Sequence, residues 1–214
     1  MVQQSNSRIV SGRRKTNWKE RQERDPYVLQ ARREGWRSRA VYKLEQILQK
    51  EALLRPDMTC IDLGAAPGGW SQYVSAKLKG RCRIIALDLL PMDALPSVEQ
   101  IQGDFTEDDT LLLLQSLIED SPVHLVMSDM APNISGNKAV DQPRSMYLAE
   151  LALDLAVKVL KPQGSFVCKL FQGQGTDDFV ANAKGNFERV KIVKPKASRP
   201  GSSEVYLVAR NYQL

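Results

Sequence analysis

Short apolar runs alternate with amphipathic segments along most of the chain, a pattern typical of an α/β protein. The apolar runs predict buried strands over residues 58–63, 82–88, 98–102, 123–127 and 165–170. Helical spacing predicts helices over residues 26–34, 39–50, 70–78, 109–118, 143–160 and 176–184. Strands that alternate with helices in this way predict one parallel sheet with helices on both faces.

The last two predicted strands break this alternation. They cover residues 187–194 and 204–210, and the few residues between them include Pro195 and Pro200. Because this connection is too short for a crossover helix, the two strands should pair antiparallel. The result is a seven-stranded, mostly parallel sheet whose last strand runs antiparallel. Its first residue, Glu204, would then lie at the edge where the parallel strands end.

A glycine-rich turn joins the first strand to the next helix in the segment CIDLGAAPGGW, residues 60–70. Ligands of such sheets bind beyond the carboxyl ends of the strands, and glycine lets the backbone approach them. Gly64, Gly68 and Gly69 do not match the G-x-G-x-x-G spacing of a dinucleotide site. Asp62 would repel a pyrophosphate but could accept hydrogen bonds from an ammonium group. That suits the amino-acid end of S-adenosylmethionine (SAM); a tight turn without a ligand is the alternative.

Charged residues also end the later strands. Asp88 ends the second strand, where an acidic residue can bind ribose hydroxyls, and Asp104 could accept from an adenine amino group. Asp129 precedes a proline-containing loop, an active-site arrangement, and the polar residues 134–138 could act as a lid. Lys169 closes an apolar strand, which is unusual because lysine is rarely buried unless it has a role.

Positive charge is concentrated near the N-terminus. Residues 1–43 contain 12 Lys and Arg against 4 Asp and Glu, whereas the whole chain has a net charge of +5. We expect a disordered basic arm over residues 1–24 and one domain over residues 25–214, whose helices within residues 25–50 contribute to RNA binding. The candidate phosphate contacts lie among aromatic residues, as suits RNA, and are Arg32, Arg33, Arg37 and Arg39. A merely solvated tail is the alternative for the first part of the arm.

Composition narrows the class of protein further. A hydrophobic content of 43% supports one sizeable core, and no apolar run approaches the roughly 20 residues that span a bilayer. Cys60, Cys82 and Cys168 are far apart and lie in strand-like segments, so they are interpreted as buried free thiols of a reducing compartment. His124 precedes an apolar strand and is interpreted as structural. We therefore expect a cytoplasmic monomer that binds neither a metal nor a membrane.

Several strings of residues together resemble one family, the FtsJ/RrmJ ribosomal RNA 2′-O-ribose methyltransferases. The resemblance covers roughly residues 25–210, and the strings that carry it are DLGAAPGGWS (62–71), DLLPMD (88–93), QGDF (102–105), MSDMAPN (127–133) and EVY (204–206). Two features depart from the family: the basic arm before Asp25, and the Pro200-Gly201 pair in the loop before Glu204. The resemblance implies a Rossmann-like SAM-dependent methyltransferase fold.

The resemblance also implies roles for individual residues. The catalytic tetrad would be Lys43, Asp129, Lys169 and Glu204. The SAM ligands would be Gly68, Trp70, Asp88, Asp104 and Asp129, beside the Asp62 already singled out. The usual substrate of the family is a uridine of large-subunit (23S) ribosomal RNA, so the large ribosomal subunit is the expected partner.

The implied chemistry is compatible with these residue types. A ribose 2′-hydroxyl must lose its proton as it attacks the sulfonium methyl group, and Lys169 is the candidate base. A second ammonium group, such as that of Lys43, favours the neutral amine, whereas Asp129 and Glu204 favour the charged form; the sequence leaves this balance open. The alternatives are a 2′-O-methyltransferase of transfer RNA or of an mRNA cap, and an inactive RNA-binding module. The glycine spacing disfavours a nicotinamide-dependent oxidoreductase.

Overall fold

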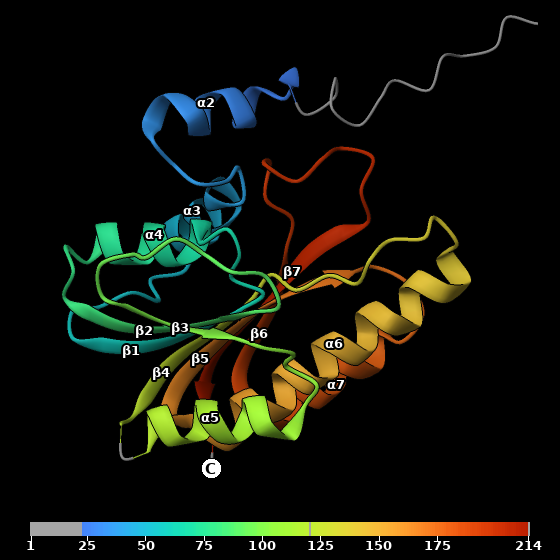
Figure 1. Ribbon diagram of the computed structural model, residues 1–214. Coiled ribbons are helices and arrows are strands. Elements are labelled where there is room, and N and C mark those ends of the chain that lie inside the picture. The colour runs from blue at the N-terminus through green and yellow to red at the C-terminus, as the bar shows by residue number, and fades with distance from the viewer. Residues whose placement is uncertain (1–22, 120, 214) are drawn as a thin grey trace, which may run out of the picture.

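The computed structural model describes residues 23–119 and 121–213, which form a three-layer α/β structure around one sheet (Figure 1). The strands are β1 (Met58–Leu63), β2 (Cys82–Asp88), β3 (Val98–Gln102), β4 (Val123–Ser128), β5 (Leu160–Phe171), β6 (Phe187–Val193) and β7 (Glu204–Tyr212). Their order is β3-β2-β1-β4-β5-β7-β6, and β7 pairs antiparallel with both β5 and β6. The predicted seven-stranded sheet with an antiparallel last strand is confirmed.

Helices cover both faces of the sheet, as predicted. They are α2 (Pro26–Glu34), α3 (Val41–Lys50), α4 (Gly69–Lys77), α5 (Asp108–Ile118), α6 (Lys138–Val159) and α7 (Thr176–Asn186). Helices α2 to α4 lie on one side of the sheet and α5 to α7 on the other (Figure 1). Each face has its own apolar core, one containing Leu44 and Ile47 of α3 and the other Ala152 and Leu153 of α6. The alternating side chains of the strands supply both cores.

The first helix is bounded as its sequence predicts. The Asp25 side chain accepts a hydrogen bond from the Tyr27 amide at 3.0 Å, and Pro26 occupies the first helical position. Gly35 ends α2 with φ of +75°, a left-handed conformation that glycine adopts without steric cost. These local signals place α2 directly before the junction that leads to α3.

Three elements begin two or more residues away from their predicted starts. Helix α6 begins at Lys138 rather than at Pro143, because the Asn137 side chain caps it by accepting from the Ala139 amide at 3.1 Å. Helix α3 begins at Val41 rather than at residue 39, with Ala40 at its N-cap position. Strand β5 begins at Leu160 rather than at residue 165, because Leu160 already pairs with Val123 of β4.

The cysteines and the single histidine have structural environments. Cys60 and Cys168 are buried and Cys82 is half-buried, and all three are free thiols. Burial raises the pKa of the Cys60 and Cys168 thiols, which keeps them protonated and unreactive. His124 accepts a hydrogen bond at Nδ1 from the Thr59 amide at 3.0 Å, where the register between β1 and β4 shifts. In the part of the chain that the structure describes, no helix is long and apolar enough to cross a membrane.

Candidate active site

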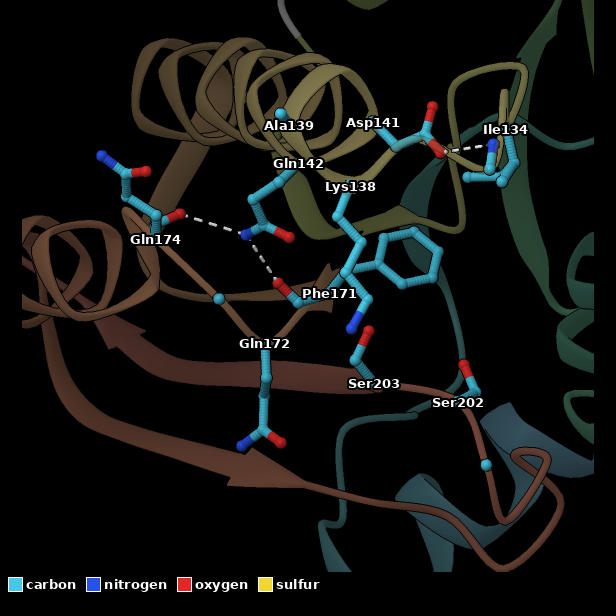
Figure 2. A pocket seen from close by; sticks show the side chains of 13 residues that line it. Ile134, Lys138, Ala139, Asp141, Gln142, Phe171, Gln172, Gln174, Ser202 and Ser203 are labelled. Carbon is cyan, nitrogen blue, oxygen red and sulfur yellow. Dashed lines mark hydrogen bonds between the residues drawn. The ribbon is translucent and has the colours of Figure 1, made fainter.

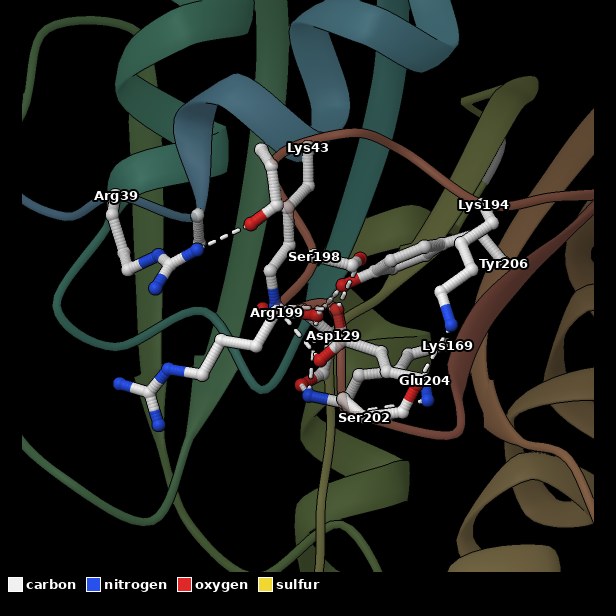
Figure 3. Close-up of polar contacts among 12 residues, drawn as sticks. Arg39, Lys43, Asp129, Lys169, Lys194, Ser198, Arg199, Ser202, Glu204 and Tyr206 are labelled. Atoms are coloured by element: carbon white, nitrogen blue, oxygen red, sulfur yellow. Dashed lines mark hydrogen bonds and ion pairs between the residues drawn. The ribbon is translucent and has the colours of Figure 1, made fainter. Parts of the chain in front are cut away.

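The ends of β4 and β5 and the start of β7 bring the predicted tetrad together at one edge of the sheet (Figure 3). In the β5–β7 ladder, Lys169 is opposite Tyr206 and Phe171 is opposite Glu204. Directly opposed residues of an antiparallel pair point to the same face, and so do residues two apart along a strand. Lys169 and Glu204 therefore lie on one face, toward which α3 contributes Lys43.

The four tetrad residues form two ion pairs. Lys43 Nζ lies 2.8 Å from Glu204 Oε1, although the two residues are 161 positions apart in the chain. Lys169 Nζ lies 3.2 Å from Asp129 Oδ1 and also donates to the main-chain oxygen of Asp129. The side chains of both lysines are largely buried, with exposures of 13% for Lys43 and 8% for Lys169. Two ammonium groups, each held by a carboxylate, thus face the same edge.

Tyr206 connects the two ion pairs and was not among the predicted site residues. Its hydroxyl donates to Asp129 Oδ1 at 2.7 Å, and its ring centroid lies 5.8 Å from Lys43 Nζ. Burial, with the Asp129 and Glu204 carboxylates, raises the pKa of Tyr206 well above its usual range, so its hydroxyl remains a donor. The alternation of β7, which puts Tyr206 on the same face as Glu204, is the sequence signal that could have identified it.

Asp129 is ionised despite its buried position. Burial by itself would raise the pKa of this carboxyl, but the ammonium groups of Lys169 and Lys43 and the Tyr206 hydroxyl outweigh burial and hold the pKa below its usual range. The lowered pKa favours the charged form of Asp129 in the folded protein, so this carboxylate is a suitable partner for the Lys169 ammonium group.

Hydrogen bonds with the preceding loop hold Glu204 in place. The buried Ser198 donates through Oγ to Glu204 Oε1 at 2.7 Å, and Ser202 Oγ accepts from the Glu204 amide at 3.1 Å. Arg39 binds the same loop at the Ala197 oxygen and forms an ion pair with Asp25. The Pro200-Gly201 departure from the family pattern is thus compatible with a well-anchored Glu204.

A cavity of about 450 Å³ lies beside this tetrad, beyond the ends of β1, β2 and β4. Its lining includes the carboxylates of Asp88, Asp104 and Asp129 and, among the described residues, no Lys or Arg. Gly64 allows close approach there, since φ is +72° and a Cβ atom would lie 2.7 Å from the Met130 side chain. Carboxylates suit hydroxyl, amino and cationic groups and repel phosphates, so the lining fits SAM and not a dinucleotide.

The remaining carboxylate, Asp62, lies beneath the glycine turn. It is fully buried, and its Oδ2 accepts from the Ser71 hydroxyl at 2.7 Å. Burial raises the pKa of Asp62 to about 7. Its Oδ1 has no hydrogen-bond partner in the described part of the chain, which is unusual for a buried oxygen and fits an acceptor for a ligand's ammonium group.

Two predicted cofactor residues contribute differently from the carboxylates. Gly68 caps α4 with φ of +101°, so its main chain forms the turn. The Trp70 side chain is buried and donates through Nε1 to the Ala40 oxygen at 2.9 Å. Its ring also packs against Tyr206, with centroids 5.7 Å apart. The Trp70 side chain is thus part of the core, and only its main chain is available to the turn.

The four predicted RNA-binding arginines divide into two kinds. Arg32 and Arg33 are exposed in the last turn of α2. Arg37 donates to the main-chain oxygens of Pro67, Asp93 and Ala94, at 3.2, 2.8 and 2.9 Å, and so supports the glycine turn. Arg39 is used in the contacts with Asp25 and Ala197 already described. No sequence pattern distinguished the two exposed arginines from these two structural ones.

The predicted lid segment is attached to the start of α6. Asp141 accepts from the amide and hydroxyl of Ser135, at 2.9 and 2.7 Å, and from the Gly136 amide at 2.9 Å. Residues 134–138 therefore form a hydrogen-bonded turn at the helix N-terminus. Over residues 23–119 and 121–213, no group of three or more His, Cys, Asp and Glu residues is arranged to hold a metal ion.

Comparisons with known proteins agree with this geometry. The model of the FtsJ-like methyltransferase family matches residues 36–212. A protein from Legionella pneumophila (strain Corby) named ribosomal RNA large subunit methyltransferase E is 54% identical over 208 residues, which cover 97% of this chain and 100% of the relative. A Pseudomonas aeruginosa protein of the same name is 55% identical over 88% of this chain and 91% of its own. A solved Plasmodium falciparum structure, of a candidate ribosomal RNA methyltransferase, has a TM-score of 0.74 and 30% identity over 83% of this chain and 98% of its own.

Proposed function

This chain belongs to the FtsJ-like methyltransferase family and is a SAM-dependent methyltransferase, and from that premise we propose that its methyl acceptor is a ribose 2′-hydroxyl of large-subunit ribosomal RNA, at a uridine. The observation that supports this acceptor best is the pair of buried ammonium–carboxylate contacts beside the carboxylate-lined cavity. A hydroxyl nucleophile needs a place for its proton and groups that orient it, and this edge offers both. The named relatives motivate ribosomal RNA as the substrate class.

The carboxylates of the cavity would hold the cofactor. SAM, when bound, supplies a methyl group on a positively charged sulfur. Asp88 would accept from the ribose hydroxyls of the cofactor and Asp104 from its adenine amino group. Asp62 and the main chain at Gly68 and Trp70 would bind the amino-acid end. Asp129 lies between this cavity and the lysines, so its negative charge would favour the sulfonium on one side and Lys169 on the other.

Lys169 would accept the proton that the 2′-hydroxyl loses. The 2′-hydroxyl would have to lose its proton as its oxygen takes the methyl group that SAM supplies. Lys169 Nζ in its neutral form accepts that proton and becomes an ammonium group paired with Asp129. Lys43 and Glu204 would donate to and accept from the ribose, which orients the hydroxyl for in-line attack. Tyr206 keeps Asp129 in place by its hydrogen bond.

Binding of the RNA would begin at the basic N-terminal part. Arg32 and Arg33 present exposed guanidinium groups at the end of α2, and Arg37 and Arg39 would support the junction between α2 and α3. The proposed arm over residues 1–24 lies largely outside the described residues. We propose a monomer that acts on ribosomal RNA in the cytoplasm.

The test is to map 2′-O-methylated positions in ribosomal RNA with and without this protein. The purified protein should then restore the missing methyl group with labelled SAM, and a Lys169→Met variant should not. A methyl group that appears only on transfer RNA or on a capped mRNA would support the alternative substrates instead. An absence of transfer to every RNA would favour an RNA-binding module.

A further inference from the structure

A second and larger cavity lies at the same edge of the sheet (Figure 2). It has a volume of about 670 Å³, and none of the predicted catalytic or cofactor residues lines it. Its walls are the last residue of β5 with the connection that follows (residues 171–174), the start of α6 and the loop residues 201–203. The loop after β4 separates the two cavities: Ala131 and Asn133 line the cofactor cavity, whereas Ile134 and Gly136 line the larger one.

The position of Phe171 connects this cavity to the reaction site. Phe171 follows Lys169 by two residues on β5, which is about 7 Å along the strand. It is also the direct partner of Glu204 in the β5–β7 ladder. If a ribose is held at Lys169 and Glu204, a group attached to that ribose can therefore extend into the larger cavity.

The lining suits a flat heteroaromatic group. The half-exposed Phe171 ring faces the cavity beside the Lys138 side chain and the Ser203 hydroxyl (Figure 2). Gln172 and Gln174 have exposed side chains, and the amide groups of these side chains make no hydrogen bond to any described residue. The one acidic lining residue, Asp141, is occupied by Ser135 and Gly136. An aromatic face surrounded by unused donors and acceptors, with little net charge, is typical of a site for an unstacked base.

The cavity is built before any ligand enters it. Gln142 donates through Nε2 to the main-chain oxygens of Phe171 and Gln174, at 3.0 and 3.1 Å. A Cβ atom at Gly173 would lie 2.7 Å from the Gln142 side chain, so only glycine leaves room for this contact. The Gln172 amide also donates to the Ser203 oxygen at 2.9 Å, which joins two of the walls. The main chain that carries Phe171 is thereby held at a defined position.

We propose that this cavity receives the base of the nucleotide whose ribose is methylated, with Phe171 stacked on that base. Gln172 and Lys138 supply the hydrogen-bonding groups at its edges. The proposal rests on the proposed ribose methylation. The larger cavity would bind a nucleobase of the RNA, and the cofactor cavity on the other side of the loop after β4 would bind SAM.

The test is a cycle that combines a protein change with a change of the RNA. Large-subunit ribosomal RNA is assembled by ligation either with its normal target nucleotide or with an abasic ribose at that position, and single-turnover methyl transfer is measured. Phe171→Leu removes the stacking face and keeps apolar bulk. Gln172→Ala is a second, exposed variant, and Tyr147→Leu is the matched control, because Tyr147 is an exposed aromatic of α6 that does not line the cavity. SAM affinity is measured for each variant to confirm that it is folded.

Stacking of one base on an aromatic side chain changes binding by about 5-fold to 150-fold. Removal of the base should therefore slow the wild type by a factor in this range. Phe171→Leu should slow transfer to normal RNA by a similar factor and should not slow transfer to abasic RNA further, whereas Tyr147→Leu should behave as wild type. The proposal is overturned if the effects of Phe171→Leu and of the missing base simply multiply. It is also overturned if the coupling appears only when a neighbouring nucleotide is abasic. Failure of the wild type to methylate normal RNA would instead refute the proposed function.

Discussion

Replacement of Lys169 by methionine separates the proposed chemical role of this lysine from its role in the fold. Methionine retains an unbranched apolar side chain and removes the ammonium group, so the packing around β5 changes little. The change removes the ammonium group that pairs with Asp129 and leaves the Tyr206 hydroxyl as a hydrogen-bond donor to this carboxylate. Both catalysis and stability should therefore suffer, for different reasons.

The two effects have different expected sizes. Loss of a general base slows turnover by about 10²-fold to 10⁴-fold. Removing one partner of a buried ion pair costs about 3–5 kcal/mol of stability, and the lower end applies here because Asp129 is 19% exposed and keeps its Tyr206 hydrogen bond. A double variant, Lys169→Met with Asp129→Asn, removes the unpaired charge. It should recover much of the lost stability without recovering turnover.

The pH dependence checks the electrostatic part of this reasoning. The pKa of Asp129 is held below its usual value in the folded protein, so the carboxylate stabilises the fold above the ordinary carboxyl pKa, and this stability is lost as the pH falls through the lowered value. Without the Lys169 ammonium group, the pKa of Asp129 should rise. The destabilisation by Lys169→Met should consequently be largest near neutral pH and smaller in acid.

Single-turnover transfer at saturating SAM and RNA measures the chemical step, and thermal unfolding measures stability. Lys169→Arg should not restore turnover, because a guanidinium group remains protonated. Lys191→Met is the matched control: Lys191 also pairs with a buried carboxylate, Glu51, at 2.8 Å, but Arg210 keeps that carboxylate paired. If the Lys169→Met rate stays within about threefold of wild type while the control is normal, the proton leaves to water and the proposed role of Lys169 is refuted.

Three further predictions concern the cofactor, the RNA and the fold. Asp88→Ala should weaken SAM binding by about 1–3 kcal/mol in calorimetry, and unchanged affinity would remove Asp88 from the site. Replacing Arg32 and Arg33 by alanine should lower the slope of log affinity against log salt by about 0.7 for each lost contact with single-stranded RNA, with SAM affinity constant; an unaltered slope would mean that they do not touch phosphates. Because burial raises the pKa of Asp62 to about 7, its ionisation destabilises the cofactor-free fold as the pH rises from about 4 to about 7. Asp62→Asn should therefore become progressively more stable relative to wild type over this interval, and a pH-independent difference would contradict the raised pKa.

The architecture and the class of chemistry could be predicted from the sequence. Apolar runs with helical segments between them predicted the parallel strands, and the short connection between residues 194 and 204 predicted the antiparallel β7. These features follow from local periodicity and chain length, which need no knowledge of distant contacts. The membership of the SAM-dependent methyltransferases, suggested by the strings around Asp62 and Asp129, is confirmed by the family match.

Contacts between distant parts of the chain determine which groups act together. Lys43 pairs with Glu204 across 161 positions, and Arg37 and Arg39 are used inside the molecule, whereas Arg32 and Arg33 are exposed. The register between β5 and β7 determines where Tyr206 and Phe171 lie. The Asn137 side-chain cap determines where α6 begins. Residues of the same type look alike in sequence, and their roles diverge because folding places one guanidinium group beside carbonyl oxygens and leaves another in water.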